Sequence, residues 1–181
     1  MKSVLISIQP HWCELIASGE KALEVRKTRP KLETPFKCYI YCTKSKKGWF
    51  WFDSPNIRRD GAVIGEFICD KINRFDVPYP AYQKELDPAI LKESCCTYYQ
   101  LHRYAYHDSL YGWHISDLKI YDKPKALSAF CFPPERFCEP GLCGRCPKYE
   151  MPGEYGDVMF DCEWKRPLLR PPQSWHYVEE V

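Results

Sequence analysis

The opening of the chain constrains the fold most, because its first 27 residues predict a strand, a helix and a second strand in close succession. Residues 3–8 alternate and are rich in β-branched side chains, which is typical of a strand. Pro10 suits the first turn of a helix, and residues 11–18 carry apolar side chains at helical spacing. Gly19 stands where a C-terminal cap belongs, and residues 22–27 alternate as a strand does.

The rest of the chain continues the mixture of strands and helices. Strands are predicted at residues 36–42, 62–69 and 112–121, and a helix is predicted from Pro88 to about Tyr106. From residue 132 onward proline and cysteine become dense, which indicates an irregular excursion before a short terminal strand. These elements predict an α+β domain with a small curled sheet or barrel.

Composition narrows the class of protein further. A chain of 181 residues suits one domain, or one domain that carries an insertion. Its apolar runs are far shorter than the roughly 20 residues that span a bilayer. No signal peptide is visible at the N-terminus, so we expect a cytoplasmic protein without a membrane partner. The net charge of +2 argues against a general binder of duplex nucleic acid. Residues 21–59 nevertheless hold eleven Lys or Arg and three acidic residues, which is compatible with a solvated basic face or with an electropositive mouth for a ligand.

The segment after the first predicted helix has the densest chemical content. Lys21 lies at a loop-to-strand junction, and Glu24 and Arg26 share one face of the strand that follows. Lysine offers a point charge, arginine a planar fork for phosphate or a base edge, and glutamate an acceptor for amino groups. The spacing alone is equally that of an exposed charge pair with a nearby lysine, which would contribute less than about 1 kcal/mol.

Gly19, Lys21, Glu24 and Arg26 form a G-x-K-x-x-E-x-R pattern, and with the strand and helix before it this opening resembles the ASCH domain family. Residues 111–115 and 170–175 also resemble segments of that family. The resemblance implies a small PUA-like β-barrel with flanking helices and a cleft lined by the motif. It divides the chain into a barrel at residues 1–130, a Cys/Pro-rich excursion at 131–164 and a tail at 165–181 that returns to the barrel.

The resemblance also implies that RNA or a modified nucleoside is the partner. One branch of the family hydrolyses acetylated cytidine with a lysine, a threonine and a glutamate, and another member is described as a ribonuclease. Lys21 matches the catalytic lysine, but Glu24 stands where that branch has its threonine, so only a general-base role for water carries over. The sequence leaves open a binding module, a hydrolase that uses Lys21 and Glu24 on RNA or acetylated cytidine, and an adaptor that uses the Cys-rich segment.

Several further residues are candidates for ligand contact. Trp113 and His114 lie on a predicted strand, and Gln173, Ser174 and Trp175 follow a diproline that holds its segment extended. Either tryptophan could stack on a base, a contact that contributes about 1–3 kcal/mol. The alternative is that both tryptophans fill the core or the wall of the cleft, and that His114 is a structural histidine.

Four cysteines near the C-terminus suggest a metal site. Cys138, Cys143, Cys146 and Cys162 have a C-x4-C-x2-C-x15-C spacing, and the Cys143-Gly-Arg-Cys146 step is typical of a zinc knuckle. Four thiolates would hold a structural Zn²⁺ and leave no open position for water. The alternative is a set of unrelated free thiols, and Cys131 could replace one ligand.

Overall fold

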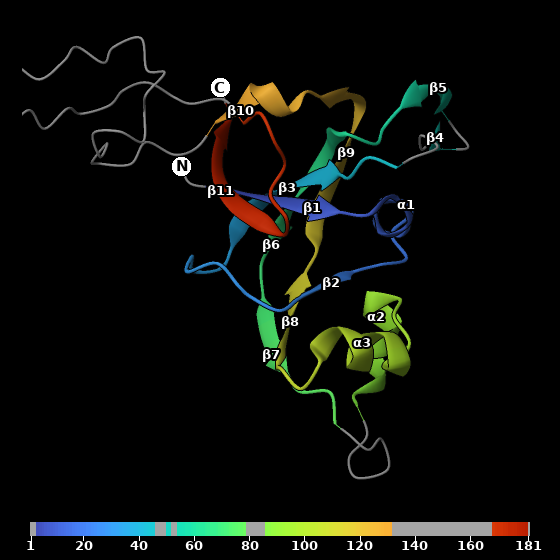
Figure 1. Ribbon diagram of the computed structural model, residues 1–181, viewed down its shortest axis with the longest axis vertical. Coiled ribbons are helices and arrows are strands. Elements are labelled where there is room, and N and C mark those ends of the chain that lie inside the picture. Colours follow the sequence, from blue (N-terminus) through green and yellow to red (C-terminus); the bar gives the residue numbers. More distant parts are fainter. Residues whose placement is uncertain (1–2, 46–49, 52–53, 79–85, 132–167, 181) are drawn as a thin grey trace, which may run out of the picture.

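The computed structural model describes residues 3–45, 50–51, 54–78, 86–131 and 168–180, and its strands form two principal sheets (Figure 1). The larger sheet has the order β10-β11-β1-β3-β6-β9, and the smaller has the order β2-β8-β7. The strands of the larger sheet are β1 (Ser3–Ile8), β3 (Phe36–Cys42), β6 (Ala62–Cys69), β9 (Ser116–Lys125), β10 (Phe130–Cys131) and β11 (Trp175–Glu180). Those of the smaller sheet are β2 (Leu23–Arg26), β7 (Ile72–Phe75) and β8 (Leu110–His114), and β4 (Phe50–Trp51) pairs separately with β5 (Ser54–Arg58).

Strand β1 is central to the larger sheet, where it runs parallel to β3 and antiparallel to the C-terminal strand β11. All six of its residues are buried. Val4 and Ile6 belong to one hydrophobic cluster and Leu5 to another, so apolar side chains cover both faces of the strand. A strand covered on both faces carries consecutive apolar residues, as this strand does from Val4 to Ile6.

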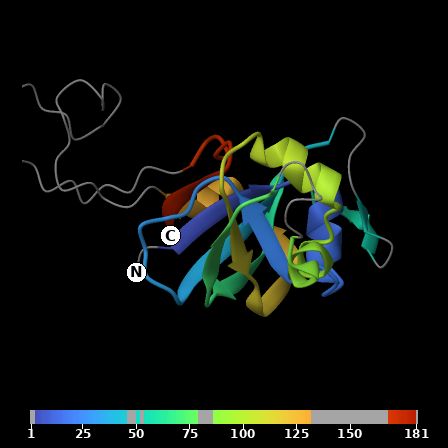
Figure 2. The same ribbon diagram turned by 90° about the horizontal axis from the view of Figure 1, so that it is seen from below.

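Three α-helices, α1 (Pro10–Ala17), α2 (Pro88–Ser94) and α3 (Tyr98–Ala105), lie on the same side of the molecule (Figure 1, Figure 2). The single helix predicted from Pro88 to Tyr106 is divided into α2 and α3. Cys95 adopts a left-handed conformation with φ of 55°, which ends α2. Thr97 and Gln100 then form a capping box that begins α3, so two local signals interrupt one helical pattern.

The strand predicted at residues 112–121 is likewise divided, because the chain passes from one sheet to the other at Ile115. The backbone N–H of Ile115 donates to the carbonyl of Ala22 at the start of β2. Beyond this point β9 pairs with β6 in the larger sheet. The α+β class is confirmed, but within the described part of the chain the two sheets do not close into the small barrel that was expected.

The described residues contain no helix that is both long and apolar enough to cross a membrane. Residues 132–164 of the Cys/Pro-rich excursion lie outside the described residues, so its proposed boundaries stay a prediction.

Candidate functional site

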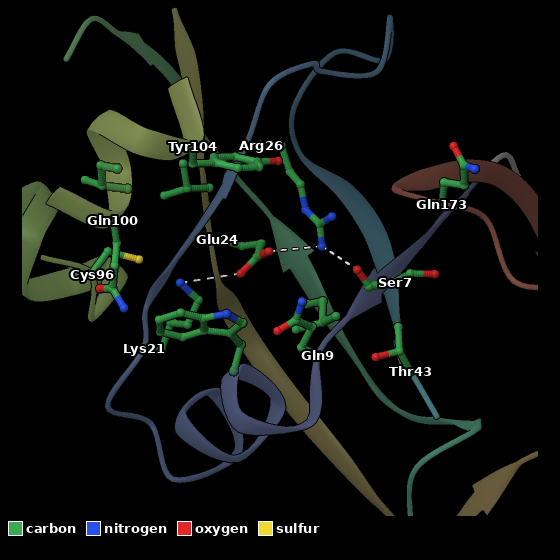
Figure 3. A pocket seen from close by; sticks show the side chains of 14 residues that line it. Ser7, Gln9, Lys21, Glu24, Arg26, Thr43, Cys96, Gln100, Tyr104 and Gln173 are labelled. Atoms are coloured by element: carbon green, nitrogen blue, oxygen red, sulfur yellow. Dashed lines mark hydrogen bonds and ion pairs between the residues drawn. The ribbon is translucent and has the colours of Figure 1, made fainter. Parts of the chain in front are cut away.

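A cavity of about 410 Å³ opens where the helices meet the ends of β1 and β2 (Figure 3). Its wall includes the three charged residues singled out in the sequence, Lys21, Glu24 and Arg26. The remaining lining residues are Ser7, Ile8, Gln9, Trp12, Val25, Thr43, Cys96, Gln100, Leu101, Tyr104 and Gln173. The cavity is therefore built from segments that are distant in the sequence.

Lys21 is aimed into the structure by the turn after α1. Gly19, with φ of +80°, reverses the chain in a conformation that side chains with a Cβ rarely adopt. The Lys21 ammonium then donates to the Leu23 carbonyl at 2.9 Å and to the Ser94 carbonyl at 2.7 Å. Ser94 is the last residue of α2, so the ammonium satisfies a carbonyl at the negative end of that helix.

Glu24 lies between the two cations and connects them. Its carboxylate is 3.5 Å from the Lys21 ammonium and 3.0 Å from the Arg26 guanidinium. The three residues are between 3% and 8% exposed, so water screens their charges weakly. The hypothesis of an exposed charge pair is therefore wrong, because this is a buried network of two positive charges and one negative charge.

Arg26 joins this network to the N-terminal strand and to the C-terminal tail. One terminal nitrogen donates to the Ser7 carbonyl at 2.6 Å, and the other makes a long 3.4 Å contact with the Ser174 hydroxyl. The Ser7 hydroxyl donates in turn to the Pro172 carbonyl at 2.6 Å. The Arg26 Nε is buried and has no hydrogen-bond partner among the described residues. Arg26 thus keeps donor capacity that the described protein groups do not use.

Two aromatic rings and three side-chain amides also line the cavity. The Lys21 ammonium lies 4.9 Å from the ring centroid of Trp12, and Tyr104 is 42% exposed. The amides are those of Gln9, Gln100 and Gln173. A ring supplies a flat apolar face, and an amide supplies both a donor and an acceptor.

Two further ionisable groups of this wall, Tyr104 and Cys96, are favoured in their neutral forms. Burial raises the pKa of Tyr104, although the Arg26 guanidinium acts in the opposite direction. Burial likewise raises the pKa of the Cys96 thiol against the effect of Lys21. Both groups are therefore hydrogen-bond donors at neutral pH, and Cys96 is a poor nucleophile.

The tail residues predicted to contact a ligand are partly brought to the cavity. Gln173 lines it, and Ser174 contacts the Arg26 guanidinium that lines it. Trp175 lies outside the lining set, where its indole N–H donates to the Thr28 hydroxyl at 3.0 Å and its ring packs against the main core. The tail approaches the cavity because β11 pairs with β1.

The residues predicted on strand β8 are placed elsewhere. Trp113 is fully buried in the main core, at an edge-to-face angle to Phe36, so its ring presents no face to a ligand in this conformation. Its position on a strand covered by the larger sheet explains the difference. His114 is outside the cavity, and its Nδ1 is 2.6 Å from an Asp70 carboxylate oxygen.

The predicted zinc ligands Cys138, Cys143, Cys146 and Cys162 lie outside the described residues. Among the residues that the structure does describe, no group of three or more metal-binding side chains comes together. Cys131 is buried at the end of β10, and its thiol donates to the Glu179 carbonyl.

Several lining residues were not singled out in the sequence. Gln100 and Tyr104 are four residues apart on α3, a spacing that places two side chains on one helix face. The Thr97-x-x-Gln100 capping signature could have located the start of that helix, and with it the two side chains. Ser7 and Gln9 carry no such signal, since they simply follow the apolar run of β1.

The α+β fold around this charged cavity is similar to that of ASCH domains in solved structures. Crystal structures of ASCH proteins from Zymomonas mobilis share this fold. The ASCH protein itself aligns with a TM-score of 0.51 at 20% identity, over 69% of this chain and 73% of that chain. A tyrosine-to-phenylalanine mutant aligns with the same TM-score and identity over 70% and 77%, and a serine-to-alanine mutant over 69% and 74%. No family model and no curated protein matches the sequence.

Proposed function

We propose that this protein binds single-stranded RNA or a modified nucleoside, with one base held in the cavity. The observation that carries the proposal is the buried Lys21–Glu24–Arg26 network on the wall of a 410 Å³ cavity. Burying three charges is costly, and their mutual pairing offsets the cost only in part. Such a network is retained more readily where it also serves a ligand.

The neighbouring groups favour a planar heterocycle as that ligand. Tyr104 lines the cavity and is partly exposed, and proteins stack single-stranded bases on such rings. The amides of Gln9, Gln100 and Gln173 suit the mixed donors and acceptors of a base edge. The volume lies within the range of about 300–1,000 Å³ that is usual for small-molecule sites.

The contacts of Lys21 favour binding over catalysis by this lysine. An ammonium has three donors, and here they face the Leu23 carbonyl, the Ser94 carbonyl and the Glu24 carboxylate. A nitrogen engaged in this way has no lone pair to offer a substrate. Lys21 is therefore proposed to position Glu24.

A hydrolase remains the second candidate because Glu24 is in the cavity wall. Its carboxylate has about four acceptor sites, and the two cations use only some of them. A free site could accept a proton from water that attacks RNA or an acetylated cytidine. Incubation of the protein with RNA or acetylated cytidine distinguishes the two candidates, because only the hydrolase releases product.

The proposal is tested by titrating the protein with short single-stranded RNA and comparing Tyr104→Ala with Tyr106→Ala. Tyr106 is the matched control, since it follows the same helix, is 77% exposed and does not line the cavity. Loss of one stacking contact should weaken binding by about 1–3 kcal/mol in the Tyr104 variant only. Equal affinity of the two variants, or no binding of RNA by the unaltered protein, would contradict the proposal.

A further inference from the structure

The loop that leaves the cavity after Arg26 is exposed and basic. Residues 27–31, here called the basic loop, contain three exposed cations, Lys27, Arg29 and Lys31. The positions between them face the protein, because the Thr28 hydroxyl accepts a hydrogen bond from the Trp175 indole at 3.0 Å and Pro30 is buried. The loop therefore presents three like charges to solvent within five residues, and an anionic partner would relieve their mutual repulsion.

The charges of the basic loop are poorly matched within the protein. Neither Arg29 nor Lys31 forms an ion pair with any residue that the structure describes. Glu33, the acid that follows the loop, is exposed and pairs with neither of them. Lys27 has one long ion pair of 4.0 Å with Asp108, whose side chain is 72% exposed. An exposed pair at that distance contributes little, so the loop keeps most of its positive charge available.

Contacts at both ends hold the basic loop beside the cavity. The Lys27 ammonium lies 5.6 Å from the centroid of the Tyr104 ring, which lines the cavity. At the other end the backbone N–H of Lys31 donates to a tyrosine hydroxyl of β11 at 2.7 Å, and the tail just before β11 supplies Gln173 to the cavity. Figure 3 shows Tyr104 and Gln173 on opposite sides of Arg26, the last residue before the loop.

We infer that the basic loop binds the phosphates of a single-stranded RNA whose base occupies the cavity, so that the ligand is an RNA chain rather than a free nucleoside. This inference rests on the proposed binding function and narrows it to one class of ligand. Proteins that bind single strands combine cations along the backbone with rings for stacking, and Tyr104 supplies such a ring beside the loop. A free nucleoside has no phosphate and would leave the cations of the loop unused.

The distances are within the reach of a short strand. From the length of an extended chain, the Cα atoms of Arg29 and Lys31 lie no more than about 11 and 18 Å from that of Arg26. A stacked strand advances about 3.4 Å per nucleotide, so about ten nucleotides extend from the cavity past the whole loop.

The test compares a double variant of the loop with a matched control. The double variant combines Arg29→Gln with Lys31→Gln, and the control combines Lys119→Gln with Lys123→Gln. The control lysines are exposed on β9, the edge strand farthest from β10 and β11, and lie outside the cavity lining. Lys27 stays in place because it contacts a ring of the cavity wall. Both variants should keep the thermal unfolding midpoint of the parent, because all four side chains are exposed and have no ion-pair partner among the described residues.

The full chain is titrated with a single-stranded RNA of about ten nucleotides that contains all four bases, and with the four common nucleosides and acetylated cytidine. The parent should bind the RNA more tightly than any nucleoside. Each phosphate contact with a single strand contributes about 0.7 to the slope of log K against log salt, so the loop double variant should lower the slope by about 1.4. Between about 50 and 200 mM salt the parent should therefore lose about sevenfold more affinity for RNA than this variant loses, and the control should keep the slope of the parent.

The outcomes separate this inference from the function on which it rests. If neither the RNA nor any nucleoside binds, the proposed function fails and the inference with it. If a nucleoside binds at least as tightly as the RNA, if the loop double variant keeps the salt slope of the parent, or if the control lowers the slope equally, the inference is wrong while the cavity remains a binding site. Loss of binding to vesicles of anionic lipid in the loop double variant, without a change in RNA binding, would assign the loop to a membrane surface and also refute the inference.

Discussion

Replacing Glu24 by glutamine should destabilise the protein far more than the loss of an ordinary ion pair. The substitution keeps the shape of the side chain but removes its negative charge. Lys21 and Arg26 would then be left as two buried cations without a counter-charge, and the new amide N–H₂ would face one of them. Both cations are also held by backbone carbonyls, so neither can move easily into solvent.

The magnitude follows from the burial of the three side chains, whose exposed fractions are 2% for Lys21, 8% for Glu24 and 10% for Arg26. Removing one partner from a buried charge network costs about 3–5 kcal/mol. That is a large part of the roughly 5–15 kcal/mol that keeps a domain folded. We therefore expect Glu24→Gln to lose about 3–5 kcal/mol of unfolding free energy.

The measurement is urea-induced unfolding of the parent, Glu24→Gln and the control Asp108→Asn. Asp108 pairs with Lys27 at 4.0 Å, with side chains that are 72% and 41% exposed, so its loss should cost less than about 1 kcal/mol. If Glu24→Gln loses no more stability than the control, the network contributes little and the reasoning from burial is refuted.

Two substitutions and one elemental analysis test other features of the protein. Tyr121 donates a hydrogen bond to the Glu66 carboxylate at 2.5 Å. Burial acts to raise the pKa of Glu66, but this hydrogen bond and the nearby Lys37 together lower that pKa below its usual value. Tyr121→Phe should therefore lower the free energy of unfolding by about 1.5–3 kcal/mol near neutral pH. The difference from the parent should shrink as the pH falls and Glu66 becomes protonated, and a difference that does not change with pH would contradict this. Gly65→Ala should lower the free energy of unfolding by at least about 1–3 kcal/mol, because the added Cβ would lie 2.5 Å from the Lys119 carbonyl oxygen. Urea unfolding measures this loss, and an unchanged midpoint would contradict the expectation. We propose structural zinc at the four C-terminal cysteines, and elemental analysis below about half a zinc per chain would reject it.

Local signals in the sequence were sufficient for several strands of the larger sheet. The strand at Ser3–Ile8 and those at Phe36–Cys42 and Ala62–Cys69 are found at the predicted bounds, because each is an apolar run rich in β-branched or aromatic side chains. Gly19 also makes the turn expected after the first helix, and Lys21, Glu24 and Arg26 line one cavity.

Interrupted elements were harder to predict from local pattern. Helical propensity continues through Cys95, but the left-handed conformation there and the capping box at Thr97 divide the helix. The strand through Ile115 keeps its apolar character while it changes sheets. The helix break has a local capping signal that helical propensity does not include, whereas the change of sheet at Ile115 depends on what packs against the strand.

The sequence by itself determined which charged side chains share a short turn and strand, since a spacing of two along a strand places Glu24 and Arg26 on one face. Only the tertiary structure decided that this face is buried. Strand β1 supplies the Ser7 carbonyl to Arg26, α2 supplies the Ser94 carbonyl to Lys21, and the tail supplies Ser174 to Arg26. Burial and long-range contacts depend on how distant segments pack, and no local pattern encodes them. For the same reason the sequence alone did not determine that Trp113 lies in the core and that Gln100 lines the cavity.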